Sequence, residues 1–131
     1  MFGNDGRITA VDLYIIQQNG PKTGFPDYAS AADAVTLVYQ PESMRFRGIP
    51  VLTNTTPAGA QRGPGQNQMA MVIEPLLDKA AKALEVDRID MRRVNAPTMD
   101  GTYSDEQGPL TSAYLREAYE LGAREFDWEA K

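Results

Sequence analysis

Apolar side chains alternate with polar ones near the start of the chain, and this alternation predicts a β-strand over residues 7–17. Val11, Leu13 and Ile15 fall on one face of the two-residue repeat. The sequence Asn-Asp-Gly at 4–6 is a strong hairpin-turn signal, yet only three residues precede it. The first arm of this hairpin is therefore expected to be nearly missing, as in a piece of a longer chain or a strand that pairs with another chain. A frayed end ahead of a normal strand is the alternative.

A loop, a short helix and a second strand are predicted next. Gly, Pro, Asn and Asp are dense over 19–30, which is typical of a loop, and the alanine-rich run 31–39 predicts a short helix. Residues 44–54 alternate again and predict a second strand. Pro50 favours an edge position or a bulge in this strand, because proline cannot donate to a hydrogen-bond ladder.

The clearest helix follows Gly65. Its apolar residues recur at spacings of three and four and therefore share one helical face. Pro75 lies inside this run, and its missing N–H predicts a kink or a break near Glu74. The apolar positions are Met69, Val72, Ile73, Leu76, Leu77, Ala80, Ala81 and Leu84.

Two shorter helices are predicted after the long one. Asp87 is a suitable N-cap for a helix over 88–94. Thr111 or Ser112 is expected to cap a last helix that runs through 115–126. Strands followed by a long helix and further short helices place the chain in the α/β (α+β) class. Packing of the last helix is the expected role of its aromatic residues Tyr119, Phe126 and Trp128.

Length, charge and composition exclude several classes of function for this chain. A chain of this length is the size of one domain, so residues 1–131 are expected to form a single domain or a fragment of one. A net charge of −5 without basic runs argues against a nucleic-acid partner, and the lack of a long apolar stretch argues against a membrane. Cysteine and histidine are absent, so iron–sulfur ligation is excluded within the chain and no metal ligands are assigned. A cytoplasmic location is the default expectation.

The most unusual stretch joins the second strand to the long helix. Gly59 and the Gly-Pro-Gly sequence at 63–65 permit backbone conformations that other residues avoid, at a helix end where N–H groups have no intrahelical partner. Such an end binds anionic or electron-rich ligand atoms, and Arg62 adds a charged donor. Composition alone nevertheless favours the alternative of a structural turn with Arg62 in an ion pair, because the stretch matches neither common phosphate-loop motif.

The same stretch carries a family resemblance. The order Thr53-Asn54, Gly-Ala-Gln-Arg-Gly-Pro-Gly at 59–65, Gln68 and Glu74 is similar to that in the large, molybdopterin-binding subunits of molybdenum hydroxylases, the xanthine dehydrogenase and aldehyde oxidase family. The resemblance extends over nearly the whole chain in the right order. The other matching segments are 5–10 (Asp-Gly-Arg-Ile-Thr-Ala), Asn19-Gly20, 83–95 and 115–117.

The resemblance implies that the chain is an internal segment of such a subunit and part of its molybdopterin-binding domain. These enzymes insert water-derived oxygen at a carbon of an aldehyde or an N-heterocycle, with molybdenum held on molybdopterin. Carried onto this chain, Gln61, Arg62 and Gly63 are expected to bind the molybdenum-molybdopterin cofactor, and Pro64 to face a small-molecule substrate. The expected partners are the rest of the molybdopterin subunit and the subunits that carry iron–sulfur clusters and FAD.

Departures from the family pattern limit this expectation. Pro64 stands where purine-oxidising members present an aromatic ring, and 29–34 holds small residues and Asp33 where those members carry a substrate-facing arginine. A purine substrate is therefore in doubt. The family's catalytic glutamate lies near the carboxyl end of the full subunit and has no counterpart here, so no catalytic residue is assigned and the chain is not expected to be active alone. A non-catalytic scaffold or assembly module of the same fold is the alternative.

The remaining charged residues have simpler interpretations. Glu74 and Asp78 lie four residues apart on the long helix and are expected to be solvated, with Asp78 paired to Lys82. Arg45 and Arg47 are expected to be solvated charges on an edge strand. A surface loop is expected around the acidic residues Asp100, Asp105 and Glu106.

Overall fold

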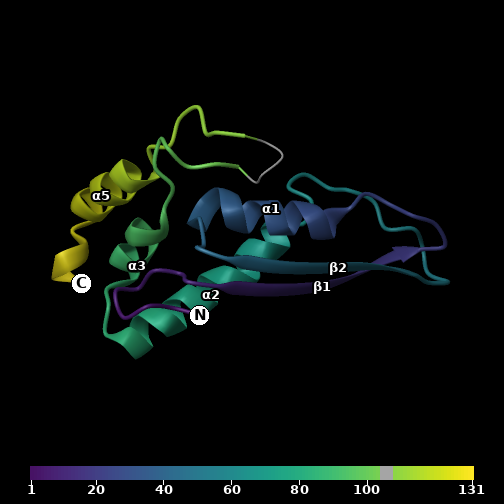
Figure 1. The fold of residues 1–131 in the computed structure, drawn as a ribbon, viewed down its shortest axis with the longest axis horizontal. Coiled ribbons are helices and arrows are strands. Elements are labelled where there is room, and N and C mark those ends of the chain that lie inside the picture. The colour runs from purple at the N-terminus through teal and green to yellow at the C-terminus, as the bar shows by residue number, and fades with distance from the viewer. Residues whose placement is uncertain (104–107) are drawn as a thin grey trace.

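Two parallel strands joined by a helix form the centre of the fold (Figure 1). The computed structural model describes residues 1–103 and 108–131, so Asp105 and Glu106 lie outside the described residues, whereas Asp100 is exposed. The prediction of an α/β (α+β) fold is confirmed. In chain order the elements are β1 (Val11–Gly20), α1 (Asp27–Tyr39), β2 (Met44–Leu52), α2 (Gln66–Leu84), α3 (Arg88–Asn95), α5 (Leu115–Phe126) and the 3-10 helix η1 (Trp128–Ala130).

One face of the two-stranded sheet is covered and the other is open. Leu13 and Ile15 of β1 pack with side chains of α1 and α2, as the two-residue repeat predicts. The intervening residues Tyr14 and Ile16 point the opposite way and are exposed. The strand itself begins at Val11, later than predicted, and continues to Gly20 in a segment that was expected to be a loop.

The predicted turn at 4–6 forms, and its first arm is short but ordered. Phe2 makes an antiparallel bridge with Ile8, and Gly3 N donates to Arg7 O at 2.9 Å. Thr9 N also donates to Met1 O at 3.2 Å. The three residues before the turn therefore pair with the approach to β1, and the alternative of a frayed end is wrong.

Helix α1 begins at Asp27, four residues earlier than the alanine-rich run predicts. Pro26 stands at its N-cap position, where a residue without an N–H costs little. The first turn is held from outside the helix, because Tyr28 N donates to the side-chain Oε1 of Gln17 at 3.0 Å. The start of α1 is therefore fixed by a tertiary contact that the local sequence does not predict.

Helix α2 is continuous over 19 residues, so, of the kink or break predicted near Glu74, the break does not occur. Pro75 has no N–H to donate to the carbonyl of Met71, four residues earlier. Met71 and Pro75 are both exposed, so water can hydrogen-bond that carbonyl. Among the described residues, no helix combines the length and the apolar character needed to cross a membrane.

The ends of the later helices confirm one prediction and correct another. Asp87 caps α3, and its Oδ1 accepts from Ile89 N at 2.7 Å and from Asp90 N at 3.1 Å. Helix α5 begins only at Leu115, so a cap at Thr111 or Ser112 is wrong. Residues ahead of α5 are held in other contacts; for example, the N–H of Ala113 points to the sulfur of Met99 at 3.2 Å.

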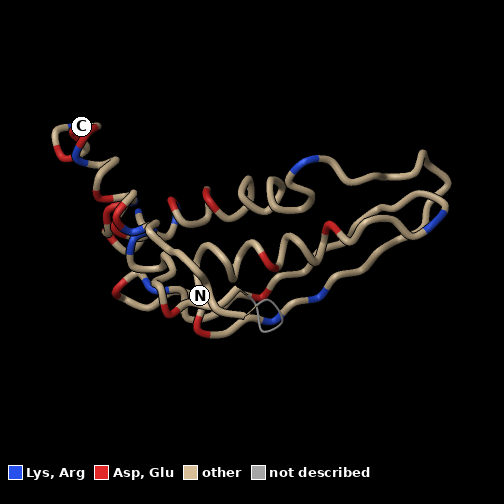
Figure 2. The backbone as a smooth tube through the Cα atoms, turned by 90° about the horizontal axis from the view of Figure 1, so that it is seen from above, with Lys and Arg blue, Asp and Glu red and all other residues tan. Residues whose placement is uncertain are grey.

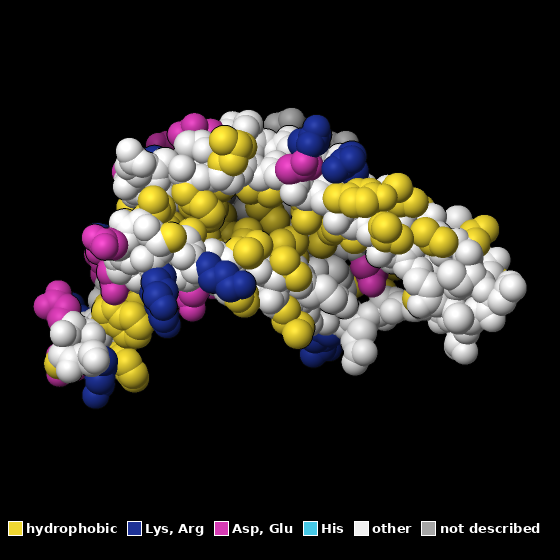
Figure 3. Space-filling model, turned by 90° about the horizontal axis from the view of Figure 1, so that it is seen from below, with side chains coloured by type: hydrophobic (Ala, Val, Ile, Leu, Met, Phe, Trp, Pro, Cys, Tyr) yellow, Lys and Arg dark blue, Asp and Glu magenta, His cyan; other side chains and the backbone are white. Residues whose placement is uncertain are grey.

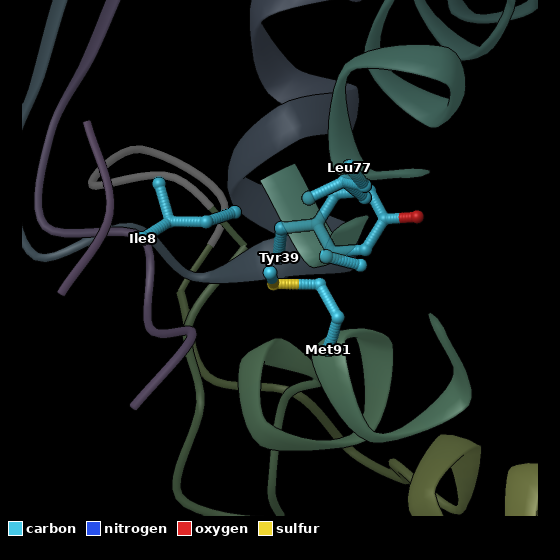
Figure 4. Close-up of a cluster of buried hydrophobic side chains, with 5 residues drawn as sticks. Ile8, Tyr39, Leu77 and Met91 are labelled. Carbon is cyan, nitrogen blue, oxygen red and sulfur yellow. The ribbon is translucent and has the colours of Figure 1, made fainter. Parts of the chain in front are cut away.

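The main core lies where α2 and α3 meet the end of α1 (Figure 4). Ile8, Tyr39, Leu77 and Met91 converge there from four segments, and each is at most 3% exposed. The buried Asn95 closes this core, since its Oδ1 accepts from Ile8 N at 2.8 Å while its Nδ2 donates to backbone carbonyls. Charged residues crowd this end of the molecule, near the C-terminus, and are sparse toward the other end (Figure 2).

Candidate functional site

The linker between β2 and α2, residues 53–65, reaches the end of the molecule opposite α3 and α5 (Figure 1). It is tied to the end of β1, because Thr53 N donates to Gly20 O at 2.8 Å and Ala58 N donates to Asn19 O at 3.2 Å. Gly20 has a φ of 81°, and an added Cβ would lie 2.6 Å from Pro57 Cα. Only glycine permits this close approach of the two segments.

The amide of Gln17 organises the neighbouring turn. Its Nε2 donates to Asn19 Oδ1 at 2.7 Å and to Phe25 O at 2.8 Å, while its Oε1 accepts from Tyr28 N. One side chain therefore links the end of β1, the following loop and the start of α1. Sequence reasoning missed Gln17, because its partners come from segments whose proximity is set only by the fold.

The glycine-rich turn before α2 brings two helix ends together. Gly63 and Gly65 have φ values of 71° and 76°, in the left-handed region. A Cβ on Gly65 would lie 1.9 Å from the backbone oxygen of Asp27, so the amino end of α2 packs directly against the amino end of α1. Gly59 differs, because a Cβ there would meet only open space.

Hydrogen-bond donors gather at this turn without protein acceptors. Among the described residues, the N–H groups of Gln66 and Gln68 donate to no protein atom. Arg62 is exposed and its guanidinium forms no ion pair within the described part of the chain, although its carbonyl accepts from Asn67 Nδ2 at 3.1 Å. The alternative of a structural turn with Arg62 in an ion pair therefore finds no support. The exposed residues Gln61 and Arg62 leave their polar groups open to a ligand.

A groove of about 350 Å³ runs beside the turn, between β1 and the first turns of α1 and α2. Figure 3 shows a band of hydrophobic side chains on the underside of the molecule, hollowed near its middle. Asp27 lines the groove, and its Oδ1 is buried with no hydrogen-bond partner in the described residues. The other lining residues include Leu13, Tyr14, Ile15, Gly65, Gln68 and Val72.

The two carboxylates of α2 bind an arginine and remain partly exposed to solvent. Arg92 of α3 is only 15% exposed and lies 2.7 Å from Glu74 and 2.9 Å from Asp78. The predicted Asp78–Lys82 pair is wrong, because Asp78 pairs with Arg92 and Arg88 instead. Within residues 1–103 and 108–131, no group of three or more Asp, Glu, His or Cys side chains is arranged to hold a metal ion.

Tyr39 extends this network into the core. Its hydroxyl donates to the Glu74 carboxylate. Burial, together with the negative charge of Glu74, raises the pKa of Tyr39 well above its usual value. Burial likewise raises the pKa of Tyr119 on α5. These residues join α1, α2, α3 and α5 and serve the fold rather than a ligand.

The arginines of β2 are not simply solvated, contrary to prediction. Arg45 hydrogen-bonds the carboxylate of Asp12 on β1, and this hydrogen bond holds the pKa of Asp12 below its usual value. Arg47 lies 3.7 Å from the same carboxylate and stacks over the ring of Tyr14, 4.7 Å from its centroid. The pairs are exposed and cross the strands, so they help to hold β2 in register.

Comparisons with known proteins agree on one family. A family model described as the molybdopterin cofactor-binding domain matches residues 1–96. The xanthine dehydrogenase molybdenum-binding subunit of Escherichia coli O157:H7 is 29% identical over 134 residues, which cover 97% of this chain and 17% of that protein. Quinoline 2-oxidoreductase from Pseudomonas putida 86 superposes with a TM-score of 0.85 and 25% identity, over 98% of this chain and 17% of that one. The aldehyde oxidoreductase of Desulfovibrio gigas, with a TM-score of 0.77 and 24% identity, shares the fold.

Proposed function

This chain belongs to the molybdopterin cofactor-binding domain family of xanthine dehydrogenase-like oxidoreductases, and from that premise we propose that it supplies part of the cofactor-holding surface of a molybdenum-dependent hydroxylase. The observation that carries the proposal is the donor-rich turn at 59–68, which lies inside the matched residues 1–96. The chain spans 17% of the length of the xanthine dehydrogenase molybdenum-binding subunit and of the quinoline 2-oxidoreductase chain. Residues 1–131 therefore act as one domain or domain fragment of a larger subunit.

The chemistry of the turn fits molybdopterin. A pterin edge and a phosphate present oxygen and nitrogen acceptors, and the turn offers them the N–H groups of Gln66 and Gln68 and the guanidinium of Arg62. We assign the contact to Gln61, to Arg62 and to the backbone of Gly63, supported by the free N–H groups of Gln66 and Gln68. When bound, the cofactor supplies the redox-active molybdenum. The residues of this chain would bind and orient it.

The same turn suggests where the substrate lies. Pro64 follows the cofactor-binding residues and has no aromatic ring to stack on a purine. An aldehyde or a small N-heterocycle is therefore the proposed substrate class, with Pro64 as the contact from this chain. Because the proline ring is rigid, uncharged and without an N–H, Pro64 would contact a substrate by shape rather than by donating a hydrogen bond.

Catalytic turnover would require the rest of the molybdopterin subunit. The family's catalytic glutamate has no counterpart among these residues, so the proposed function is cofactor binding within an assembly and not turnover by this chain alone. The proposed partners are the rest of the molybdopterin subunit and subunits that carry iron–sulfur clusters and FAD. A cytoplasmic location fits these partners.

A scaffold without cofactor is the second candidate. It is favoured by the charged network of Arg92, Glu74 and Asp78, which joins α3 to α2 and stabilises the fold. A scaffold would not depend on Arg62, whose exposed guanidinium forms no ion pair within the described chain. The two candidates therefore differ in what the loss of Arg62 does.

The deciding experiment is native mass spectrometry with molybdenum analysis of the protein purified from its own source. We expect larger chains and near-stoichiometric molybdenum to co-purify. Arg62→Ala is expected to lower cofactor retention about tenfold, roughly the loss of one charge-assisted contact. Arg124→Ala, which removes an exposed arginine from α5, is the matched control and should retain the cofactor. Purification of the chain alone and free of molybdenum would favour the scaffold.

A further inference from the structure

The edge of β1 that faces away from β2 carries unpaired backbone groups. Val11 N donates to Ser43 O at 3.0 Å, on the side of β2. Because backbone groups alternate between the two sides of a strand, those of Asp12, Tyr14 and Ile16 point away from β2. Among the described residues, none of these three outward N–H groups donates to another part of the chain. Such an edge is a template for another strand.

The opposite edge of the sheet is a poorer template. Pro50 of β2 pairs in register with Gln17, and by the same alternation its ring nitrogen faces the outer edge of β2. Proline offers no N–H there, so a strand added along β2 would lose a ladder bond. The two edges of the sheet are therefore unequal, and β1 is the one open to pairing.

The start of the β1 edge is already paired. The arm at 1–3 runs antiparallel to residues 7–9, through the Phe2–Ile8 bridge and the bond from Thr9 N to Met1 O. In Figure 1 the N-terminus lies beside β1 on the side away from β2. An extended segment that continued this pairing would run antiparallel to β1 past Asp12, Tyr14 and Ile16.

A groove receives the side chains of such a segment. The groove of about 350 Å³ follows β1 from Leu13 to Gln17 and is walled by α2 residues such as Val72. Ile16, which is 62% exposed, and the hydrophobic band of Figure 3 leave an apolar surface along the same edge. The buried, unpartnered Oδ1 of Asp27 lies in the same groove wall and lacks a donor.

We infer that an extended segment of the remaining molybdenum-binding subunit pairs antiparallel with the outer edge of β1 and packs its apolar side chains into this groove. The inference rests on the proposed function. The solved relative with a TM-score of 0.85 holds this fold as 17% of its chain, so most of such a subunit lies outside these residues and must pack against them. A second copy of this chain is the competing occupant.

Amide hydrogen exchange tests the inference, measured on the chain alone and with the rest of the molybdenum-binding subunit from the same source. The amides of Asp12, Tyr14 and Ile16 are expected to exchange at least about tenfold more slowly in the assembly. Leu13 and Ile15, whose N–H groups face β2, should be protected in both samples. This alternation of gained protection identifies strand pairing and would not arise from a helix packed on the sheet face.

A pair of variants at one position separates the backbone contact from side-chain packing. Ile16→Pro removes the outward N–H and leaves the β2 ladder intact, so it is expected to weaken assembly about tenfold. Ile16→Ala keeps the N–H and should weaken assembly less than threefold. Equal loss in the two variants would overturn strand pairing, provided circular dichroism shows both folded.

The remaining outcomes are separable from those of the cofactor test. Protection of the edge amides that grows with concentration of the chain alone would assign the edge to a second copy and overturn the inference. Unprotected edge amides in an assembly that retains molybdenum would also overturn it, while the proposed function stands. Loss of molybdenum with the edge amides protected would contradict the proposed function only.

Discussion

The two ends of this molecule satisfy their polar groups in different ways. At the end formed by α3 and the second half of α2, Arg92 binds two carboxylates and Asn95 bonds the backbone from both ends of its amide. At the other end, Arg62, the N–H groups that begin α2 and the outer edge of β1 lack partners within the described chain. These polar groups are paired within the chain at the first end, the closed end, and lack partners among the described residues at the second, the open end.

The largest expected effect on stability comes from a core substitution at the closed end. Leu77→Ala removes a side chain that is 1% exposed from the core of Figure 4 and should lower the free energy of unfolding by about 3 kcal/mol. Leu76→Ala, on the same helix but 51% exposed, should lower it by less than about 1 kcal/mol. Urea unfolding followed by circular dichroism measures both. Similar losses would mean that Leu76 is as buried as Leu77 in solution.

The asparagines of the two ends provide the next comparison. Asn95→Ala leaves the buried N–H of Ile8 without an acceptor and should cost about 2 kcal/mol of stability. Asn67→Ala, in the exposed turn, removes one bond to Arg62 O and should cost about 0.5 kcal/mol. The same unfolding measurement applies. A larger loss for Asn67 would reverse the comparison between the ends.

Alkaline pH should lower the stability of the fold through Tyr39, at the closed end. The pKa of Tyr39 is raised in the folded chain by burial and by Glu74, so its stabilising contribution is complete below the ordinary tyrosine value of 10.0 and is lost as pH rises above it. We therefore expect the free energy of unfolding to fall above about pH 10. Tyr39→Phe should make this fall shallower, leaving the part due to Tyr119. An unchanged slope in the variant would contradict the assignment.

The smallest expected effect on stability lies at the open end. Arg62→Ala should change the free energy of unfolding by no more than about 0.5 kcal/mol, because Arg62 has no ion pair in the described chain and is exposed. Its effect is expected in cofactor retention instead. A substantial loss of stability, measured by thermal unfolding without cofactor, would return Arg62 to a structural role.

Local patterns predicted much of the fold because each depends on neighbouring residues. The alternation in β1, the apolar face of α2 and the cap at Asp87 all follow from a single segment meeting water on one side and the core on the other. The donor-rich turn was also predictable, since glycine spacing at a helix start is a local property. The family resemblance rests on the order of these same segments, and the match over residues 1–96 confirms it.

The errors occurred where distant segments meet. The early start of α1 depends on the side chain of Gln17. Asp78 pairs with Arg92, fourteen positions along the chain, rather than with Lys82, four positions along. Pro75 leaves α2 unbroken because its side of the helix faces water.

The sequence by itself therefore determined which residues form strands and helices, which faces are apolar and where donors gather. Only the tertiary structure decided which charges pair, where α1 and α5 begin and which strand edge stays open. The physical reason is that hydrophobic periodicity reports each residue's own exposure, whereas a hydrogen bond or an ion pair requires two groups within about 3–4 Å, and the fold alone sets that distance.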